Sequence, residues 1–251
     1  MHADLSDANQ VSAMLGKIKP DIIVNLAALT NVDECERNPQ QAYLANVKVV
    51  ENLAKWIHDD GNECHLVQLS TDQVYGGIGP HKEGEITLQN YYAFSKYAGE
   101  LAAAKISSTV LRTNFFGPSL CPGRTSLSDW LVESLRQEKP ITVFDDIQFS
   151  PLSLQSLVEL MELVIVRRTQ GIFNLGSKEG MSKADFAFTL AETLKLPTNH
   201  MSRGISDKVK LTAYRPKDMR MDSSRFERTF GVELPTLIEE IQSAKVAYGN
   251  L

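Results

Sequence analysis

The fold of this chain is decided by a short apolar run, Asp21-Ile22-Ile23-Val24-Asn25-Leu26-Ala27-Ala28. Pro20 comes directly before it and ends a helical pattern that starts near Ser6. A nearly unbroken apolar run without polar alternation is typical of a strand that is buried on both faces. Such strands occur in parallel sheets, so we expect residues 21–28 to form a strand inside an α/β fold.

Strand and helix signals alternate around this run. We expect helices at residues 6–19, 39–58 and 92–105, and strands at 65–69 and 108–116. The helix at 39–58 carries an apolar stripe that we expect to face the core, formed by Tyr43, Val47, Val50, Leu53 and Ala54. Strands that alternate with crossover helices indicate a doubly wound parallel sheet with helices on both faces. The predicted fold class is therefore α/β and Rossmann-like.

Shorter elements follow after Gly117. We expect helices at residues 127–137, 152–168, 182–194 and 236–248, and short strands at 141–144 and 171–175. These elements predict a small α/β lobe at the C-terminal edge of the sheet. The predicted division gives residues 1–118 and part of 141–165 to the sheet domain, and 119–140 and 166–251 mainly to the lobe.

The composition argues against several classes of protein. The formal net charge is −5 and basic residues are interleaved with acids, which disfavours binding to a nucleic-acid backbone. No apolar stretch reaches the ~20 residues of a membrane span, and no basic start with an apolar run opens the chain, so we expect a cytoplasmic protein. Cys35, Cys64 and Cys121 lie far apart without metal-ligand spacing, so we expect no metal site.

A tyrosine and a lysine stand four residues apart in Tyr92-Ala93-Phe94-Ser95-Lys96. On a helix this spacing puts both side chains on one face. Because an ammonium near a phenol favours the phenolate, we expect Lys96 to lower the pKa of Tyr92. A tyrosine tuned in this way can give or take a proton at a carbonyl or alcohol oxygen. By itself, the pair is better explained as a core tyrosine beside a surface lysine.

Polar and small residues lie at the ends of three of the expected strands, in Asn25-Leu26-Ala27-Ala28, Ser70-Thr71-Asp72-Gln73 and Arg112-Thr113-Asn114-Phe115. Ligands of open parallel sheets bind at the carboxyl ends of strands. A strand-end hydroxyl can polarise an oxygen, and the Tyr/Lys pair can move a proton, so together they supply both parts of a carbonyl reduction. Each segment alone also fits a turn or a buried strand end.

In their order and spacing, these segments resemble the extended short-chain dehydrogenases/reductases, and most of all the dTDP-4-dehydrorhamnose reductase-like sugar-nucleotide reductases. The resemblance rests on residues 21–33, 45–47, 69–75, 92–100 and 112–118, and it continues through 149–151, 171–177 and 215–222. It therefore covers nearly the whole chain. It implies that the sheet domain binds NADPH or NADH and that the lobe binds a nucleotide-sugar substrate.

The resemblance also implies roles for single residues. Tyr92 would donate a proton to the keto oxygen of the sugar, Lys96 would bind the ribose hydroxyls of the nicotinamide, and Thr71 would hold the substrate oxygen. The expected cofactor contacts are Asp4, Leu5, Asn25, Leu26, Ala27, Ala28, Asn46, Ser70, Tyr92, Lys96, Asn114 and Phe115. The expected substrate contacts are Val32, Thr71, Asp72, Gln73, Tyr92 and Phe115.

Members of this family open with a strand, a glycine-rich turn and a helix that hold the pyrophosphate of the cofactor. Here the similarity starts near the third strand of the family, around Ala3-Asp4-Leu5. We therefore expect Ile22, Ile23 and Val24 to lie at an open edge of the sheet, and this chain alone to bind the cofactor weakly or not at all. A fragment of a longer protein is the favoured explanation; a segment supplied by another chain and a shortened homologue are the alternatives.

The leading hypothesis is NAD(P)H-dependent reduction of a 4-keto group on a nucleotide-activated deoxysugar, in the supply of polysaccharide precursors, by a protein that could be a homodimer. A nucleotide-sugar epimerase stays open. Gln73 follows Asp72, where a dehydratase of this fold would need a second carboxylate, so dehydration is disfavoured. The non-enzymatic alternative is a binding or regulatory subunit that keeps the dinucleotide fold.

Overall fold

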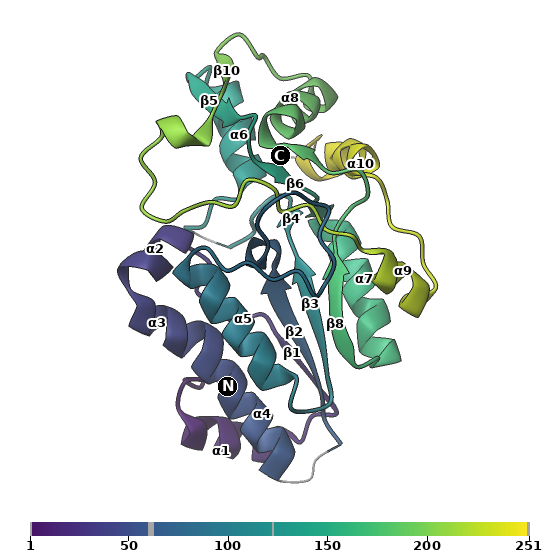
Figure 1. Cartoon of the computed structure of the whole chain (residues 1–251). Coiled ribbons are helices and arrows are strands. Elements are labelled where there is room, and N and C mark those ends of the chain that lie inside the picture. Colours follow the sequence, from purple (N-terminus) through teal and green to yellow (C-terminus); the bar gives the residue numbers. More distant parts are fainter. Residues whose placement is uncertain (1, 60–62, 122, 250–251) are drawn as a thin grey trace.

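The computed structural model describes residues 2–59, 63–121 and 123–249. Four parallel strands form its main sheet, in the order β1–β2–β3–β8 (Figure 1). They are β1 (Ile22–Asn25), β2 (His65–Thr71), β3 (Ser108–Thr113) and β8 (Gly171–Leu175). The register is continuous across the sheet, with Leu69 opposite Leu111 and Leu111 opposite Phe173. The predicted α/β fold with a parallel sheet is confirmed.

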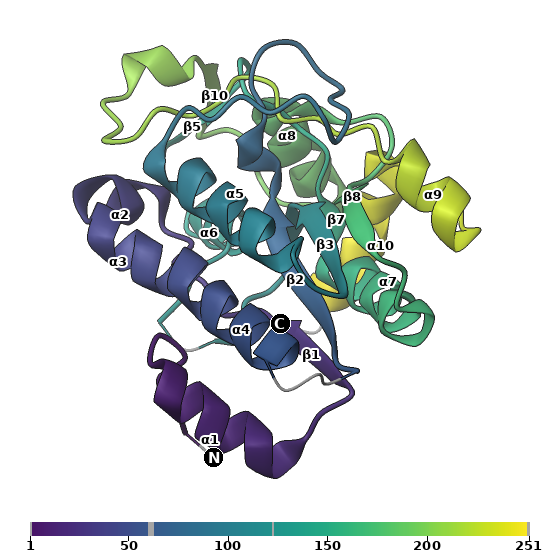
Figure 2. The same cartoon turned by 60° about the horizontal axis from the view of Figure 1, so that its bottom comes forward.

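Helices cover both faces of this sheet (Figures 1 and 2). On one face, α1 (Ala8–Ile18), α4 (Val49–Asp59) and α5 (Tyr91–Ala103) share a core with Leu66 and Val110. On the other face, α7 (Leu154–Arg167) and α9 (Ser224–Phe230) share a core with Val67 and Leu111. Since neighbouring residues of a strand point to opposite faces, the same strands supply side chains to both cores.

Strand β1 lies at an edge of the main sheet within the described residues, as the sequence predicts. Ile22 and Val24 pack against the core on one face and Ile23 against the core on the other, but all three are only partly buried, less than the sequence predicted. The strand is also shorter than the expected range of 21–28. The side-chain oxygen of Asn25 accepts a hydrogen bond from the backbone N–H of Ala27 at 3.2 Å, which turns the chain out of the sheet.

The expected helix at 39–58 consists of three segments, α3 (Pro39–Tyr43), a π-helical turn at Leu44–Lys48, and α4. Helix α2 (Val32–Arg37) precedes them. The wider turn changes which residues face inward, so Tyr43 is exposed, contrary to the prediction, and donates a hydrogen bond to Glu51 at 3.2 Å. The other four residues of the predicted stripe are buried.

A smaller lobe lies beyond the carboxyl ends of the main strands (Figure 1). Its core joins α6 (Leu127–Arg136), α8 (Lys183–Leu194) and α10 (Leu237–Gly249). Short strands pair within it or beside it: β5 (Ile141–Phe144) with β10 (Met201–Gly204), β6 (Gln148–Phe149) with β9 (Met181–Ser182), and β4 (Phe115–Phe116) with β7 (Leu152–Ser153). Strand β8 belongs to the main sheet, although the predicted division gave its range mainly to the lobe. The division itself stays a prediction.

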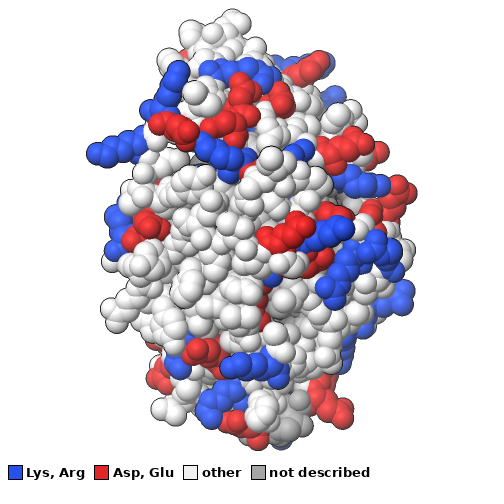
Figure 3. Space-filling view, viewed as in Figure 1, with Lys and Arg blue, Asp and Glu red and all other residues white. Residues whose placement is uncertain are grey.

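Acidic and basic side chains are interspersed over the face of the molecule seen in Figure 3, where a broad area over α3 to α5 carries few charges. On α5, the side chains of Tyr91, Phe94 and Leu101 are exposed. Within the part of the chain that the structure describes, no helix combines the length and the apolar character of a membrane span.

Candidate active site

A cavity of about 660 Å³ opens where β1, β2 and β3 end. Ten of the predicted site residues line it, namely Leu26, Ala28, Ser70, Thr71, Asp72, Gln73, Tyr92, Lys96, Asn114 and Phe115. Six others lie outside its lining, namely Asp4, Leu5, Asn25, Ala27, Val32 and Asn46. The structure thus brings together Thr71, Tyr92 and Lys96, and the ligand contacts expected for all sixteen residues stay predictions.

Helix α5 carries the tyrosine and the lysine into this cavity. Asn90 caps its first turn, because its side-chain oxygen accepts a hydrogen bond from the backbone N–H of Ala93 at 2.8 Å. Tyr92 and Lys96 are 7% and 6% exposed. The ammonium of Lys96 donates to the carbonyl oxygen of Leu69 at 2.7 Å, which ties the helix to strand β2.

Strand β2 supplies the hydroxyl. Thr71 is its last residue, and Oγ1 accepts a hydrogen bond from the backbone N–H of Gln73 at 3.2 Å and donates one to Asp72 Oδ1 at 3.2 Å. The other carboxylate oxygen of Asp72 accepts a hydrogen bond from Asn114 Nδ2 at 2.6 Å. Asn114 interrupts the expected strand 108–116 between β3 and β4, which frees its side chain to reach across to Asp72.

The pKa values in the cavity are set mainly by burial. Burial raises the pKa of Tyr92 above its ordinary value, although the interaction with the Thr71 hydroxyl opposes this. Burial lowers the pKa of Lys96 to about 8 and raises the pKa of Asp72 to about 6. The expectation that Lys96 lowers the pKa of Tyr92 is therefore wrong for this structure, because desolvation of the phenolate dominates. A phenol in this state is protonated at neutral pH and suited to donate a proton.

The π-helical turn brings Asn46 behind the site. Its side-chain oxygen accepts a hydrogen bond from the backbone N–H of Leu29 at 2.8 Å. Its amide nitrogen donates to the carbonyl oxygen of Leu29 at 3.0 Å and to Ser95 Oγ at 2.9 Å. Asn46 is 2% exposed. It therefore fixes the loop that follows β1 against α5 from behind the cavity.

The sequence reasoning missed the apolar wall that α7 contributes, formed by Leu154, Leu157, Val158, Met161 and Ile165. The spacing of these residues indicates one apolar face of a helix, but the same spacing is found in a helix that packs against an ordinary core. It also gave no role to the buried pair Glu100 and Arg112, which lies behind the site. The segments quoted for the family resemblance include both residues.

The chain matches known proteins along nearly its whole length. A family model described as the RmlD substrate binding domain matches residues 1–248. The chain is 26% identical to the probable low-salt glycan biosynthesis reductase Agl14 of Haloferax volcanii, over 98% of this chain and 84% of that protein. It is 28% identical to methionine adenosyltransferase 2 subunit beta of Pongo abelii, over 91% of this chain and 70% of that protein.

Two further matches carry the same reductase name. The chain is 26% identical to dTDP-4-dehydrorhamnose reductase of Shigella flexneri, over 92% of this chain and 81% of that protein. A crystal structure of dTDP-4-dehydrorhamnose reductase from Bacillus anthracis in complex with NADP superposes with a TM-score of 0.89. It is 24% identical, and the superposition covers 97% of this chain and 86% of the other.

Proposed function

The chain belongs to the RmlD substrate binding domain family, and from this premise we propose that it is an NAD(P)H-dependent reductase that acts on the 4-keto group of a nucleotide-activated deoxysugar. The family resemblance predicted from the sequence is confirmed. The observation that carries the proposal is that Thr71, Tyr92 and Lys96 line a single cavity at the strand ends. The names of two relatives, a glycan biosynthesis reductase and a dTDP-4-dehydrorhamnose reductase, support it.

The residues of this cavity fit the nicotinamide half of the cofactor. Leu26, Ala28 and Leu69 offer small or apolar surface to a flat ring. An ammonium has three donors, and Lys96 spends one on the carbonyl oxygen of Leu69, so two remain for ribose hydroxyls. The bound cofactor supplies the hydride that the carbonyl carbon receives.

The side chains of the protein then act on the oxygen of the sugar. In the resting protein the Thr71 hydroxyl donates its one proton to Asp72, whose carboxylate is held by Asn114. When the substrate binds, the hydroxyl turns and donates this hydrogen bond to the keto oxygen instead. As the carbonyl carbon gains a hydride, the Tyr92 phenol donates its proton to the oxygen, and the product is the alcohol. The phenolate that remains recovers a proton from solvent before the next turnover.

The charged part of the substrate has a cation on the lobe side of the cavity. Arg124 lies on the loop between β4 and α6, is exposed, and lines the cavity. A guanidinium suits the oxygens of a diphosphate. We assign Arg124 to the diphosphate of the nucleotide sugar, which places the sugar toward Tyr92.

A turnover assay tests the proposal. The protein is mixed with a dTDP-4-keto-6-deoxysugar and with NADPH or NADH, and oxidation of the cofactor is followed by absorbance. With the cofactor in large excess, to allow for the weak binding expected from the sequence, we expect turnover with at least one cofactor. The rate should fall about 100-fold in Tyr92→Phe, the scale of general acid catalysis. A Tyr92→Phe rate equal to that of the wild type would refute the role of Tyr92. Solvent deuterium entering the sugar without cofactor oxidation would indicate an epimerase instead.

A further inference from the structure

A buried ion pair lies directly behind the candidate active site. Arg112 on β3 is 1% exposed and Glu100 on α5 is 0% exposed. Arg112 Nη2 donates to Glu100 Oε2 at 2.6 Å, and Arg112 Nε donates to the two carboxylate oxygens at 3.0 and 3.1 Å. Taking two charges out of water costs several kcal/mol per ion. Replacing a buried ion pair by hydrophobic residues of similar volume often leaves a protein as stable or makes it more stable. Stability alone is therefore a weak reason for this pair.

The carboxylate of Glu100 reaches the two elements that carry the proposed reactive groups. Ser70 Oγ donates a hydrogen bond to Glu100 Oε1, and Ser70 immediately precedes Thr71 on β2. Glu100 also follows Lys96 by four residues on α5, so the two side chains lie on one face of the helix. A displacement of Glu100 would therefore move Ser70, the neighbour of Thr71, and would change the electrostatic field at the Lys96 ammonium.

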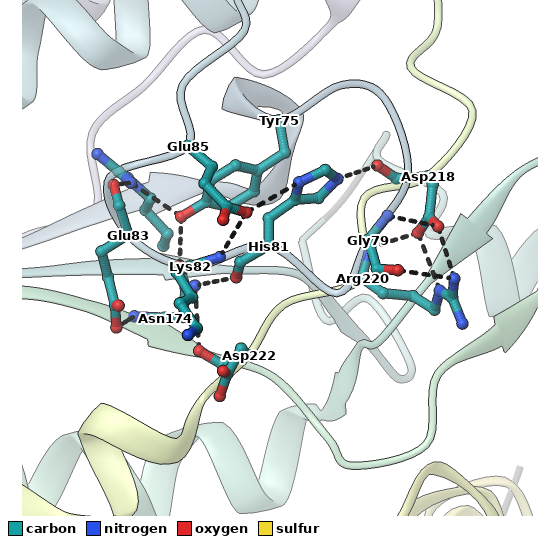
Figure 4. Close-up of polar contacts among 11 residues, drawn as sticks. Tyr75, Gly79, His81, Lys82, Glu83, Glu85, Asn174, Asp218, Arg220 and Asp222 are labelled. Carbon is teal, nitrogen blue, oxygen red and sulfur yellow. Dashed lines mark hydrogen bonds and ion pairs between the residues drawn. The ribbon is translucent and has the colours of Figure 1, made fainter.

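The guanidinium of Arg112 continues the network away from the cavity. Its Nη1 donates to the hydroxyl of Tyr75 at 2.8 Å and to the carbonyl oxygen of Glu83 at 2.6 Å. The Tyr75 hydroxyl donates to Asn174 Oδ1 on β8 at 2.6 Å. The ring of Tyr75 stacks on His81 with 5.1 Å between the ring centroids (Figure 4). Arg112 thus ties the loop that follows β2 to β3 and β8.

The same loop is tied to the C-terminal part of the chain, as Figure 4 shows. The backbone N–H of His81 donates to the carbonyl oxygen of Arg220 at 2.8 Å, and the carbonyl oxygen of His81 accepts from the backbone N–H of Asp222 at 2.8 Å. The backbone N–H of Gly79 donates to Asp218 Oδ2 at 2.8 Å. The ion pair is thus the buried centre of a network that joins three main strands, α5 and this segment.

We propose that Glu100 and Arg112 are positioning residues for the reaction proposed above: they hold the Thr71 end of β2 against the helix that carries Tyr92 and Lys96, and Glu100 keeps Lys96 charged. The positioning role rests on the proposed function. The charge on Lys96 does not, because it can be measured in the resting protein.

The groups that act on Lys96 are few. Burial lowers its pKa to about 8, and the carboxylate of Glu100 opposes this shift. Cys35 on α2 is also near, but burial raises the pKa of its thiol to about 11, so it is neutral where Lys96 titrates. Strand β2 contributes the neutral carbonyl of Leu69, and Arg112 lies behind Glu100. Loss of the Glu100 charge leaves Arg112 without its counter-ion as well. Both effects lower the pKa of Lys96 further, toward neutral pH.

The first experiment titrates Lys96 by NMR in protein labelled with ¹³Cε-lysine, where the Lys96 signal is the one lost in Lys96→Met. We expect a midpoint about one unit lower in Glu100→Gln than in the wild type, the lower end of the effect of one nearby opposite charge. The matched control is Glu240→Gln, another carboxylate that is 1% exposed and that accepts a hydrogen bond from the backbone N–H of Ser153. An unchanged midpoint in folded Glu100→Gln, or an equal shift in Glu240→Gln, overturns the proposal.

The second experiment uses Glu100→Asp, which keeps the charge but shortens the side chain by one methylene, so that one carboxylate no longer reaches both Ser70 and Arg112. We expect the Lys96 midpoint to stay near that of the wild type, while kcat falls about tenfold or more and KM changes little, because small misplacements of reacting groups are costly. An unchanged kcat refutes the positioning role. Absence of turnover in the wild type counts against the proposed function alone, and the titration of Lys96 then decides the inference.

Discussion

Replacing Asn46 by alanine tests whether the loop after β1 is held in place by one side chain. Asn46 makes three hydrogen bonds, two to the backbone of Leu29 and one to Ser95 Oγ. Asn52, a few residues further along the same helical run, is also buried but makes a single hydrogen bond, to the carbonyl oxygen of Leu5 at 2.9 Å. The two asparagines therefore form a matched pair that differs in the number of hydrogen bonds.

The expected magnitude follows from counting these bonds. Each contributes about 1 kcal/mol net to the free energy of unfolding, so Asn46→Ala should cost about 3 kcal/mol and Asn52→Ala about 1 kcal/mol. The volume removed is the same in both variants. The difference of about 2 kcal/mol therefore reports the two bonds to Leu29, whose backbone N–H and carbonyl lose their partners.

Urea unfolding followed by circular dichroism measures both variants. With a slope of about 2 kcal/mol per M, the midpoint of Asn46→Ala should lie about 1 M below that of Asn52→Ala. Hydrogen exchange should also show faster exchange at the Leu29 amide in Asn46→Ala and not in Asn52→Ala. Equal midpoints for the two variants, with Leu29 still protected, would show that Asn46 does not hold the loop.

Three further predictions concern the same region. Gly99→Ala should destabilise the protein by about 1–3 kcal/mol, because a Cβ there would press against the backbone oxygen of Asn46. Gly16→Ala on α1 has open space for the Cβ and should stabilise the protein by up to about 1 kcal/mol. In thermal unfolding, the first variant should therefore melt at a lower temperature than the wild type and the second at a higher one. Asp72→Asn should raise the free energy of unfolding at pH 8, because burial raises the pKa of Asp72 and its buried charge is costly. This gain should shrink as the pH falls through about 6 toward 3.8, since protonation removes the charge from the wild type. A gain that is constant with pH in urea titrations would contradict this prediction. Thr71→Val should lower kcat/KM of the proposed reduction by about 100-fold, the cost of one lost donor to the reacting oxygen, and an unchanged value in steady-state kinetics would remove Thr71 from the mechanism.

The elements of the fold could largely be predicted because their signals are local. The apolar run at 21–28 and the pattern at 65–69 fall on β1 and β2, and Tyr92 and Lys96 fall on one face of α5. The misses have physical causes that reach beyond a sequence window. The side chain of Asn25 ended β1 early, and the π-helical turn at 44–48 turned Tyr43 outward.

The sequence by itself determined the alternation of strands and helices, the parallel sheet, and the set of hydroxyl, phenol and ammonium groups suited to carbonyl chemistry. These follow from periodicity and spacing, which depend on residues a few positions apart. The tertiary structure alone decided that burial, rather than Lys96, sets the pKa of Tyr92, and that Glu100 and Arg112 meet behind the site. The physical reason is that desolvation and ion pairing depend on every group packed around a side chain, and those groups come from distant parts of the chain.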